Sequence, residues 1–473
     1  MSELRLIKPN ELPRLSEKPF DNLSGANATI KNLVYTLQTT YEQLGQDSFN
    51  SSKPPSTDGY KKRRNPSESQ TASNDTGVCP KQHNKADNRK PRDKGYGRDQ
   101  KLPIDERKGK HPLCCTGCSH TFTCQDKTIP FGGYYQVDFI KEEGINGFKA
   151  KNTLYITHKT WCSTCDIWTP YKACEHKSKD GYIVKDNGLI GPTLSGFIAY
   201  ANKELLLTIS RIKDLLLNGW ELQFSTGAIN AIIIDSALCS ESQYNDIKEE
   251  VIKSTYLHAD ETTWFEQHKT RWLWVFFTAT ACLFMVGGRS KKMATEIIND
   301  RFNGWLMSDG YVSYRFYKKR FRCLAHLKRK ALGLSESSNG EAQRFGEDAL
   351  SLLGEIFKQV YEARITGSLS VKALFNAKLK AFKRLCLAHR FSLHSKTYDL
   401  ATEFLNDWVC IFRILEYPQY PLTNNEAERA LRHWVLARKI SLGSQSVLGS
   451  MATAILASIV ATCKLKNHNI IAT

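Results

Sequence analysis

The sequence predicts a multidomain protein of mixed α+β and α/β class, and three observations support this. A chain of 473 residues is long enough for about two to four domains. Its composition changes sharply at residues 48–110, which are polar and basic. After about residue 250, strand-like and helix-like patterns alternate. We expect an N-terminal helix, a disordered basic linker, a small cysteine-rich β domain, a helical region, and a mixed α/β core with a helical insertion.

The N-terminal part is expected to hold one helix followed by a flexible linker. Apolar positions within residues 26–47 fall on one helical stripe: Ile30, Leu33, Leu37, Tyr41 and Leu44. The stripe fits a short coiled coil or an ordinary amphipathic helix equally well, because only about three heptads are present. Residues 48–110 are too polar to offset the chain entropy of folding, so they are predicted to form a disordered basic linker after region 1–47.

The charge balance points to a polyanionic partner. Formal net charge is +18, and the basic residues are clustered rather than evenly spread. Such an excess favours nucleic acid, although a basic surface that serves only solubility remains the alternative.

No segment is predicted to enter a membrane. The first 20 residues lack an apolar signal core, and no stretch reaches the roughly 18 apolar residues needed to span a bilayer. The run at 271–288 comes closest, but its β-branched and aromatic residues predict two strands. The chain has fourteen cysteines, and we expect a reducing, cytoplasmic compartment, in which paired cysteines are more typical of metal ligands than of disulfides.

Two C-x-x-C pairs in region 111–180 predict a structural zinc site. Each turn of this kind presents two thiolates to one tetrahedral ion, so the two turns complete a four-sulfur site: Cys115, Cys118, Cys162 and Cys165. Cys114, Cys124, Cys174 and His176 lie nearby and leave the exact ligand set open. Buried hydrophobic cysteines or a redox pair are the alternatives.

Region 188–250 is predicted to be helical. Apolar residues recur at helical spacing over residues 194–220, and Asn218-Gly219 is a helix-stop signal. Ser225 or Thr226 is then the expected N-cap of a second helix. Helix, glycine turn and capped helix resemble a helix-turn-helix, a common and weakly specific pattern.

Two aspartates are expected at strand ends in the core, residues 251–473. Asp260 lies in a strand-like run, on the same face as His258 and opposite Glu261. A hairpin, a helix and a further strand follow, and that strand ends at Asp309. Each aspartate taken singly is more typical of a turn or cap. Together in a basic chain they predict a site for two Mg²⁺ or Mn²⁺ ions about 3.5–4 Å apart.

The third carboxylate cannot be chosen by spacing. On a helix from about Asn424 to Lys439, Glu426 and Glu428 flank the apolar face on opposite sides. Glu428 shares its flank with Asn424 and Arg432, which favours a polar site there.

Basic residues near these acids are predicted to contact DNA phosphates. If residues 315–330 are helical, Phe316, Phe321, Leu324 and Leu327 are buried and the basic groups face outward; a merely solvated face is the alternative. The predicted contacts are Arg315, Lys318, Lys319, Arg320, Arg322, Lys328, Arg329, Lys330, Arg429, Arg432, Arg438 and Lys439.

These motifs together resemble one family. NSSKPPSTD, the paired C-x-x-C turns, LHADETTW, WLWVF, GRSKKMATEII, SDGYVSY, RCLAHLKRK and NNEAERALR occur in the order found in transposases of the insertion sequence 66 family. These are DDE transposases with a ribonuclease-H-like catalytic fold. The resemblance runs over most of the chain, and the ensemble of motifs is far more specific than any one of them.

The resemblance implies a catalytic triad of Asp260, Asp309 and Glu428, which are also the Mg²⁺ ligands, with a structural Zn²⁺ elsewhere. It implies cutting of transposon ends and transfer of the 3′-hydroxyl to target DNA. It also implies a helical insertion at about 320–415 in the catalytic core. The partners would be double-stranded DNA, a second copy of the chain or more, and accessory proteins of the same element, in the bacterial cytoplasm at the nucleoid.

The chain departs from the family pattern after Arg438-Lys439, where Ile440-Ser441 replace the usual Asn and aromatic residue. A catalytically inactive zinc-containing DNA-binding protein derived from a transposase is therefore the alternative. A ribonuclease-H-like repair nuclease would share the carboxylates, but the zinc domain and the linker argue against it.

Overall fold

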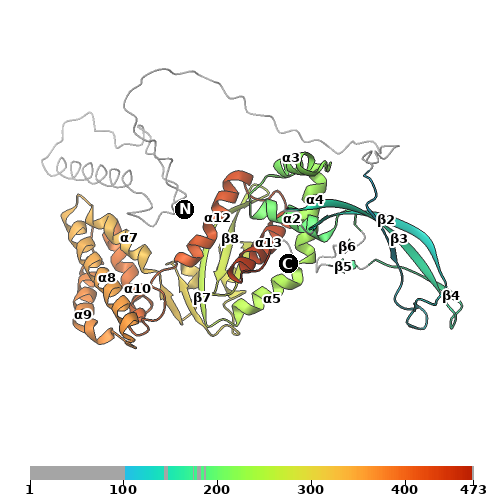
Figure 1. Ribbon diagram of the computed structural model, residues 1–473. Helices are drawn as coiled ribbons and strands as arrows, with labels where there is room; N and C mark the ends of the chain where they lie inside the picture. The colour runs from blue at the N-terminus through green and yellow to red at the C-terminus, as the bar shows by residue number, and fades with distance from the viewer. Residues whose placement is uncertain (1–101, 143–146, 174, 178–182, 186–187, 471–473) are drawn as a thin grey trace, which may run out of the picture. The chain divides into compact units, whose positions relative to one another are not determined.

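The computed structural model describes residues 102–142, 147–173, 175–177, 183–185 and 188–470 (Figure 1). The expected N-terminal helix and most of the expected linker lie outside these residues. The described chain divides into two compact units. The larger comprises residues 102–321 and 424–470, and the smaller comprises residues 322–423.

The larger unit begins with a long, curved β-ribbon (Figure 1). Its strands are β1 (Glu106–Lys110), β2 (Thr128–Ile140), β3 (Lys149–Cys162) and β4 (Ile167–Pro170). β3 pairs antiparallel with β2 and β4, and parallel with β1. β5 (Glu175–Lys177) and β6 (Ile183–Lys185) form a separate pair. The linker prediction was wrong for its last residues, because β1 takes up backbone hydrogen bonds at the edge of β3.

Four helices follow the ribbon: α2 (Pro192–Lys203), α3 (Ile209–Trp220), α4 (Thr226–Cys239) and α5 (Glu241–Ile252). The single helix expected over 194–220 is in fact two, because the Thr208 side chain caps a new helix by accepting from Arg211 N–H. α3 also runs through the expected stop and ends at Trp220, before the left-handed Glu221. The expected glycine turn is therefore absent, while Ser225 caps α4 as predicted.

A five-stranded mixed sheet forms the centre of the larger unit. Its strands are β7 (Tyr256–Glu266), β8 (Lys269–Phe277), β9 (Cys282–Gly287), β10 (Trp305–Ser308) and β11 (Arg320–Arg322), in the order β11-β10-β7-β8-β9. β7, β8 and β9 form an antiparallel meander, so the predicted hairpin is confirmed. β10 runs parallel to β7.

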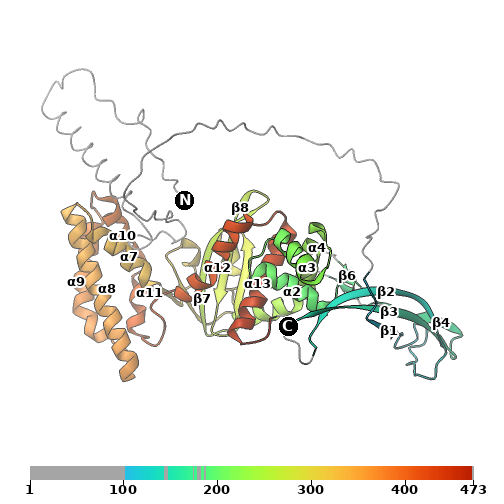
Figure 2. The same cartoon turned by 45° about the horizontal axis from the view of Figure 1, so that its top comes forward.

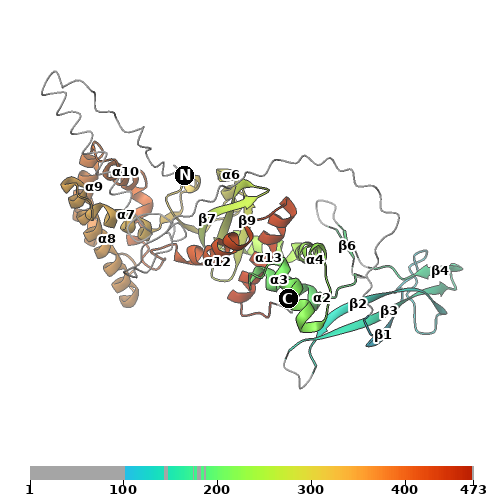
Figure 3. The same ribbon diagram turned by 90° about the horizontal axis from the view of Figure 1, so that it is seen from above.

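Helices cover both faces of this sheet. Alternate residues of β8 point to opposite faces: Leu273 and Val275 join one core cluster, and Trp274 and Phe276 join the other. The first face is covered by α12 (Asn425–Ser441) and α13 (Val447–Leu465), as Figures 2 and 3 show. The second face packs against α5 and the short α6 (Lys291–Thr295).

α13 corrects the expectation that no segment is long and apolar enough to cross a membrane. Among the described residues, this 19-residue helix passes that test by length and composition. However, 61% of its apolar window is buried inside the protein. It packs against β9, α4 and α5, and Ser458 Oγ accepts a hydrogen bond from Phe284 N–H on β9 at 2.8 Å. Its apolar character is thus explained by core packing.

The smaller unit is helical. Its elements are α7 (Leu324–Ser335), α8 (Gly340–Thr366), α9 (Lys372–His389), α10 (Ser395–Asn406), α11 (Trp408–Phe412) and the 3-10 helix η4 (Arg413–Leu415). Arg322 is fully buried in this unit, where Nη1 donates to Asp407 at 2.9 Å and Nη2 to Glu403 at 2.5 Å. This ion-paired centre explains why a guanidinium is tolerated among the helices.

The basic segment 315–330 is not one helix. A 3-10 turn, η3 (Val312–Tyr314), precedes it, β11 interrupts it, and α7 begins only at Leu324. Phe321, Leu324 and Leu327 are buried as predicted, and Phe316 is half-buried. The expectation that all basic groups face outward is wrong for Arg320 and Arg322, because all three residues of β11 are buried.

Candidate active site and metal centre

Asp260 and Asp309 lie beside each other on neighbouring strands. Asp309 directly follows β10, at a strand end as predicted, but Asp260 sits in the middle of the eleven-residue β7. β10 and β7 pair in parallel with Met307 opposite His258. The ladder ends there and β10 ends at Ser308, so Asp309 leaves the strand near Asp260, and adjacent strands are only about 4.8 Å apart. The sheet register thus brings the two carboxylates together.

The start of α12 is pinned to β7 next to Asp260. Asn424, the residue before the helix, is 1% exposed. Its Nδ2 donates to Ala259 O at 2.9 Å, and its Oδ1 accepts from His258 Nδ1 at 3.0 Å. Glu428 lies in the first turn of the helix, where its N–H donates to Asn424 O at 3.2 Å. The first helical turn, which favours negative charge, is therefore held at the middle of β7.

The charges of several carboxylates act on Asp260. Burial raises the pKa of Asp260 well above its ordinary value, and the charges of Asp309, Glu261 and Glu428 raise it further. A buried carboxylate surrounded by like charges is costly unless a cation neutralises the group. The arrangement therefore fits divalent ions with a preference for oxygen ligands, such as Mg²⁺ or Mn²⁺.

Glu426 and Glu428 have different surroundings. Glu428 is among the charges that raise the pKa of Asp260. Glu426 instead pairs with Arg429 on the exposed side of α12, and its charge acts on His258. Helical spacing left this choice open, and the placement of α12 on β7 separates the two residues.

Glu261 is a buried acid that the sequence patterns did not single out. Its side chain is 1% exposed and lies on the face of β7 opposite Asp260, as alternation predicts. Arg289 donates to Oε1, and Tyr314 O–H donates to Oε2 at 2.8 Å. Burial and the charge of Asp309 raise the pKa of Glu261 to about 7, against the lowering effect of Tyr314 and Arg289. The sequence signal that could have pointed to Glu261 is its position directly after Asp260.

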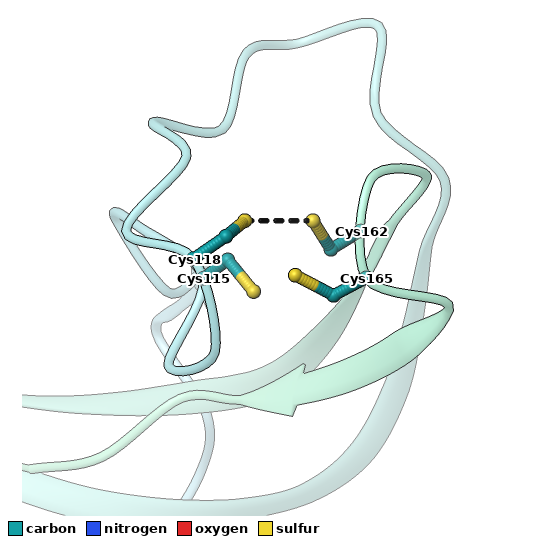
Figure 4. Close-up of side chains that lie close together, drawn as sticks. All are labelled: Cys115, Cys118, Cys162 and Cys165. Carbon is teal, nitrogen blue, oxygen red and sulfur yellow. Dashed lines mark hydrogen bonds between the residues drawn. The ribbon is translucent and has the colours of Figure 1, made fainter.

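The four predicted zinc ligands come together in the β-ribbon. Their sulfur atoms all lie within 4.8 Å of one another, and Cys118 Sγ is 3.6 Å from Cys162 Sγ. Figure 4 shows the four thiols pointing into one space. In a tetrahedral zinc–thiolate site with bonds of about 2.3 Å, sulfur atoms are about 3.8 Å apart. The four cysteines of this group could therefore hold zinc, and Cys114 and Cys124 do not belong to it.

The two C-x-x-C turns have the same backbone construction. Ser119 N–H donates to Cys115 O at 3.0 Å, and Asp166 N–H donates to Cys162 O at 2.9 Å. Ser119 and Asp166 both have positive φ, 61° and 55°. A Cβ at Gly117 would lie 3.0 Å from Ile167 Cδ1 and 3.4 Å from Cys165 Sγ, so a larger residue there would press on the second turn. Each turn thus aims its sulfurs at a common point.

The thiols of this cluster are electrostatically coupled. Backbone N–H groups of Cys118 and Gly117 lower the pKa of Cys115 to about 6. Hydrogen bonding to Cys118, burial and Cys115 raise the pKa of Cys165 to about 12. A cysteine whose pKa is lowered in this way, beside three further thiols, is typical of a soft-metal site. Cys174 and the His176 side chain lie outside the described positions.

The basic residues predicted to contact DNA divide into exposed and buried groups, and two exposed ones also have partners within the protein: Lys319 donates to Asn303, and Arg429 pairs with Glu426. The exposed ones are Arg315, Lys318, Lys319, Lys328, Arg429, Arg432 and Lys439. Arg438 is half-buried and donates to Thr263 on β7, so it ties the end of α12 to the sheet. Lys330 Nζ donates to Glu403 at 2.6 Å, and Arg329 is partly buried. With Arg320 and Arg322 buried, the exposed set is smaller than expected.

Comparison with known proteins identifies the family. The sequence matches the Transposase IS66 family over residues 187–452, which includes the carboxylates but not the cysteine cluster. Residues 6–89 match a family of unknown function (DUF6444). No curated protein matches the chain. Because the first match covers more than half of the 473 residues, the chain belongs to the IS66 family of transposases.

Proposed function

We propose that the protein is a DNA transposase that cuts transposon ends and joins their 3′-hydroxyls to target DNA. The proposal is supported by the charges of Asp309, directly after β10, and Glu428, on α12, which both act on Asp260 on β7, all within the region that matches the family. A mixed five-stranded sheet with helices on both faces supports a ribonuclease-H-like core. The helices of residues 322–423, which follow β11, support a helical insertion in that core.

Asp260, Asp309 and Glu428 would hold the divalent ions. When bound, such ions supply Lewis-acid stabilisation of the attacking and leaving oxygens of an in-line displacement. The protein's own contribution is positioning: the sheet register sets the two aspartates, and Asn424 sets the start of the helix that carries Glu428. The buried surroundings strengthen each electrostatic interaction with a bound phosphate.

The cysteine cluster would hold a structural Zn²⁺ ion. Four thiolates fill a tetrahedral shell, so no coordination position remains for substrate. The ion would fasten the distal end of the β-ribbon by joining the turn at Cys115 to the β3–β4 hairpin.

DNA contacts are proposed for the exposed basic residues. In the larger unit these are Arg315, Lys318, Lys319, Arg429, Arg432 and Lys439, and in the smaller unit Lys328. Their cations would neutralise phosphates and make binding salt-dependent. The buried and half-buried groups, such as Arg322 and Arg438, would stabilise the fold instead. We also propose that the protein is cytoplasmic and associated with the nucleoid. It would act as a dimer or larger assembly, with accessory proteins of its element.

The test is strand cleavage by the purified full chain on DNA that carries the element's terminal repeats. We expect Mg²⁺-dependent nicking that Asp309→Asn abolishes, while Asp300→Asn, at an exposed position, leaves it unchanged. Nicking that survives in Asp309→Asn would overturn the assignment. Footprinting on the repeats without cleavage under any divalent ion would favour the inactive DNA-binding alternative.

A further inference from the structure

An ion pair lies directly beside the carboxylate site, on the other face of β7. Arg289 Nε and Nη2 donate to Glu261 Oε1 at 3.1 and 3.0 Å. Glu261 is the neighbour of Asp260 in the chain, and its side chain is 1% exposed. The Arg289 side chain is 33% exposed, so only the carboxylate of this pair is buried. A buried carboxylate is costly unless it is paired, and the contacts around Arg289 indicate what the pair does.

Arg289 is held in place by two aromatic rings. Its guanidinium lies 4.0 Å from the ring centre of Trp272 and 4.1 Å from that of Tyr311. The backbone is fixed as well, because Trp274 Nε1 donates to Gly288 O at 3.1 Å. A planar, delocalised cation suits both the stacking and the forked contact with Glu261, whereas an ammonium group does not.

The segment that follows β10 is anchored to this pair at two points. Tyr311 O–H donates to Arg289 O at 2.9 Å, and Tyr314 O–H donates to Glu261 Oε2 at 2.8 Å. Between these anchors and the strand, Tyr311 N–H donates to Asp309 Oδ1 at 2.8 Å. The orientation of the Asp309 carboxylate is therefore set by a residue whose ring and hydroxyl both rest on Arg289.

We propose that Arg289 is a positioning residue for Asp309, acting through Tyr311, and that Glu261 is the anchor of Arg289 rather than a metal ligand. This inference rests on the proposed function, since it assumes that Asp309 binds the divalent ion. Arg289 and Tyr311 would not be metal ligands themselves; they would restrict the orientation of the Asp309 carboxylate through the Tyr311 N–H contact.

The contacts of Glu261 support its role as an anchor. Oε1 accepts from Arg289 and Oε2 accepts from Tyr314, so both carboxylate oxygens are engaged. Glu261 also lies on the sheet face opposite Asp260 and Asn424. Partners that orient a metal ligand from outside the coordination shell typically change metal affinity by about 10- to 100-fold when they are replaced.

The experiment measures Mn²⁺ binding to the zinc-loaded full chain by the loss of the free Mn²⁺ signal in electron paramagnetic resonance. Arg289→Lys keeps the charge but loses the fork and the stacking, so we expect about tenfold weaker Mn²⁺ binding. Arg271→Lys is the matched control, because Arg271 on β8 pairs at 3.1 Å with Glu266, which lies on β7 like Glu261. Asp309→Asn shows the effect of losing a ligand.

Two milder variants keep the test decisive if Arg289→Lys does not fold. Tyr311→Phe keeps the ring on Arg289 and removes the hydroxyl, with an expected loss of about threefold. Glu261→Gln keeps the shape, and we expect a smaller loss than in Asp309→Asn; an equal loss would make Glu261 a ligand and overturn its assignment as the anchor.

The outcomes separate this inference from the function on which it rests. The positioning role is overturned if Asp309→Asn binds Mn²⁺ weakly while folded Arg289→Lys binds it with wild-type affinity. If Arg289→Lys does not fold, wild-type affinity in Tyr311→Phe has the same meaning. Wild-type affinity in Asp309→Asn overturns the metal site itself, and with it the proposed function.

Discussion

The cysteine cluster and the carboxylate cluster both gather groups that repel one another when charged, but they are built in different ways. The cysteines come from two short turns with equivalent hydrogen bonds, so each half is assembled within five residues. The carboxylates come from two strands and a helix that lies more than 100 residues further along the chain. The cysteine site therefore depends on local geometry, and the carboxylate site depends on tertiary packing.

The two sites also differ in the function that their ligands allow. Four soft sulfur ligands close a tetrahedral shell and suit a permanent structural ion. Hard oxygen ligands leave positions for water and phosphate and exchange their ions more readily. The comparison predicts that damage to the first site appears in stability and damage to the second in catalysis.

The largest expected effect is on catalysis. Asp260→Asn should lower Mg²⁺-dependent strand cleavage by about 10³-fold or more, because a central ligand is lost. Zinc content and the unfolding temperature should not fall, since a buried like charge is removed. Cleavage is checked on labelled repeat DNA, and a lowered zinc content would show that the two sites are not independent.

The next effect concerns stability. Cys162→Ser should release the zinc and destabilise the ribbon by about 3 kcal/mol or more, because metal binding contributes directly to folding. Zinc analysis and thermal unfolding check this. Cys124→Ser is the control, since Cys124 is exposed in the same region and lies outside the cluster. Unchanged zinc content in Cys162→Ser would contradict the four-thiolate site.

A third prediction tests the tertiary support of the carboxylates. Asn424→Ala leaves the buried Ala259 carbonyl without its donor and His258 without its acceptor, at an expected cost of about 2–3 kcal/mol. We expect weaker Mn²⁺ binding as well, because Glu428 is no longer held. Asn425→Ala, at the adjacent exposed position, should do neither. Denaturant unfolding and Mn²⁺ titration measure both effects.

The smallest effect concerns the packing behind α12. Burial lowers the pKa of Lys203 to about 8, and its Nζ donates to Thr453 on α13. The unfolded chain, with an ordinary lysine pKa near 10.4, then binds more protons between about pH 8 and pH 10.4. Stability contributed at this site therefore rises with pH across that window, and the charged lysine is a cost below it.

Lys203→Met should remove this pH dependence and raise stability near pH 7 by about 1–2 kcal/mol. The difference between variant and wild type, measured by denaturant unfolding from pH 7 to 10, is the readout. Lys213→Met on α3 is exposed and serves as the control. A variant that is less stable at pH 7 would show that the Thr453 contact outweighs desolvation.

Sequence patterns predicted the fold where the signal is local. The β8–β9 hairpin, the Ser225 cap and the two C-x-x-C turns follow from alternation, capping chemistry and spacing. Predictions were wrong where a local signal competed with packing. α3 runs through Asn218-Gly219, and Arg322 is buried because Glu403 and Asp407 neutralise it within the helical unit.

Local sequence patterns are enough to identify the chemical groups and their turns: four thiols in two equivalent loops, two aspartates in strand-like runs, and a basic surface. Tertiary packing was needed to place Asp260 in mid-strand, to bring the end of β10 and Asp309 beside it, and to turn Glu261 toward Arg289. The same holds for the two glutamates of α12: the charge of Glu428 raises the pKa of Asp260, whereas Glu426 pairs with Arg429. The physical reason is that a strand's register and a helix's docking depend on burial of both faces of the sheet, which no short stretch of sequence encodes.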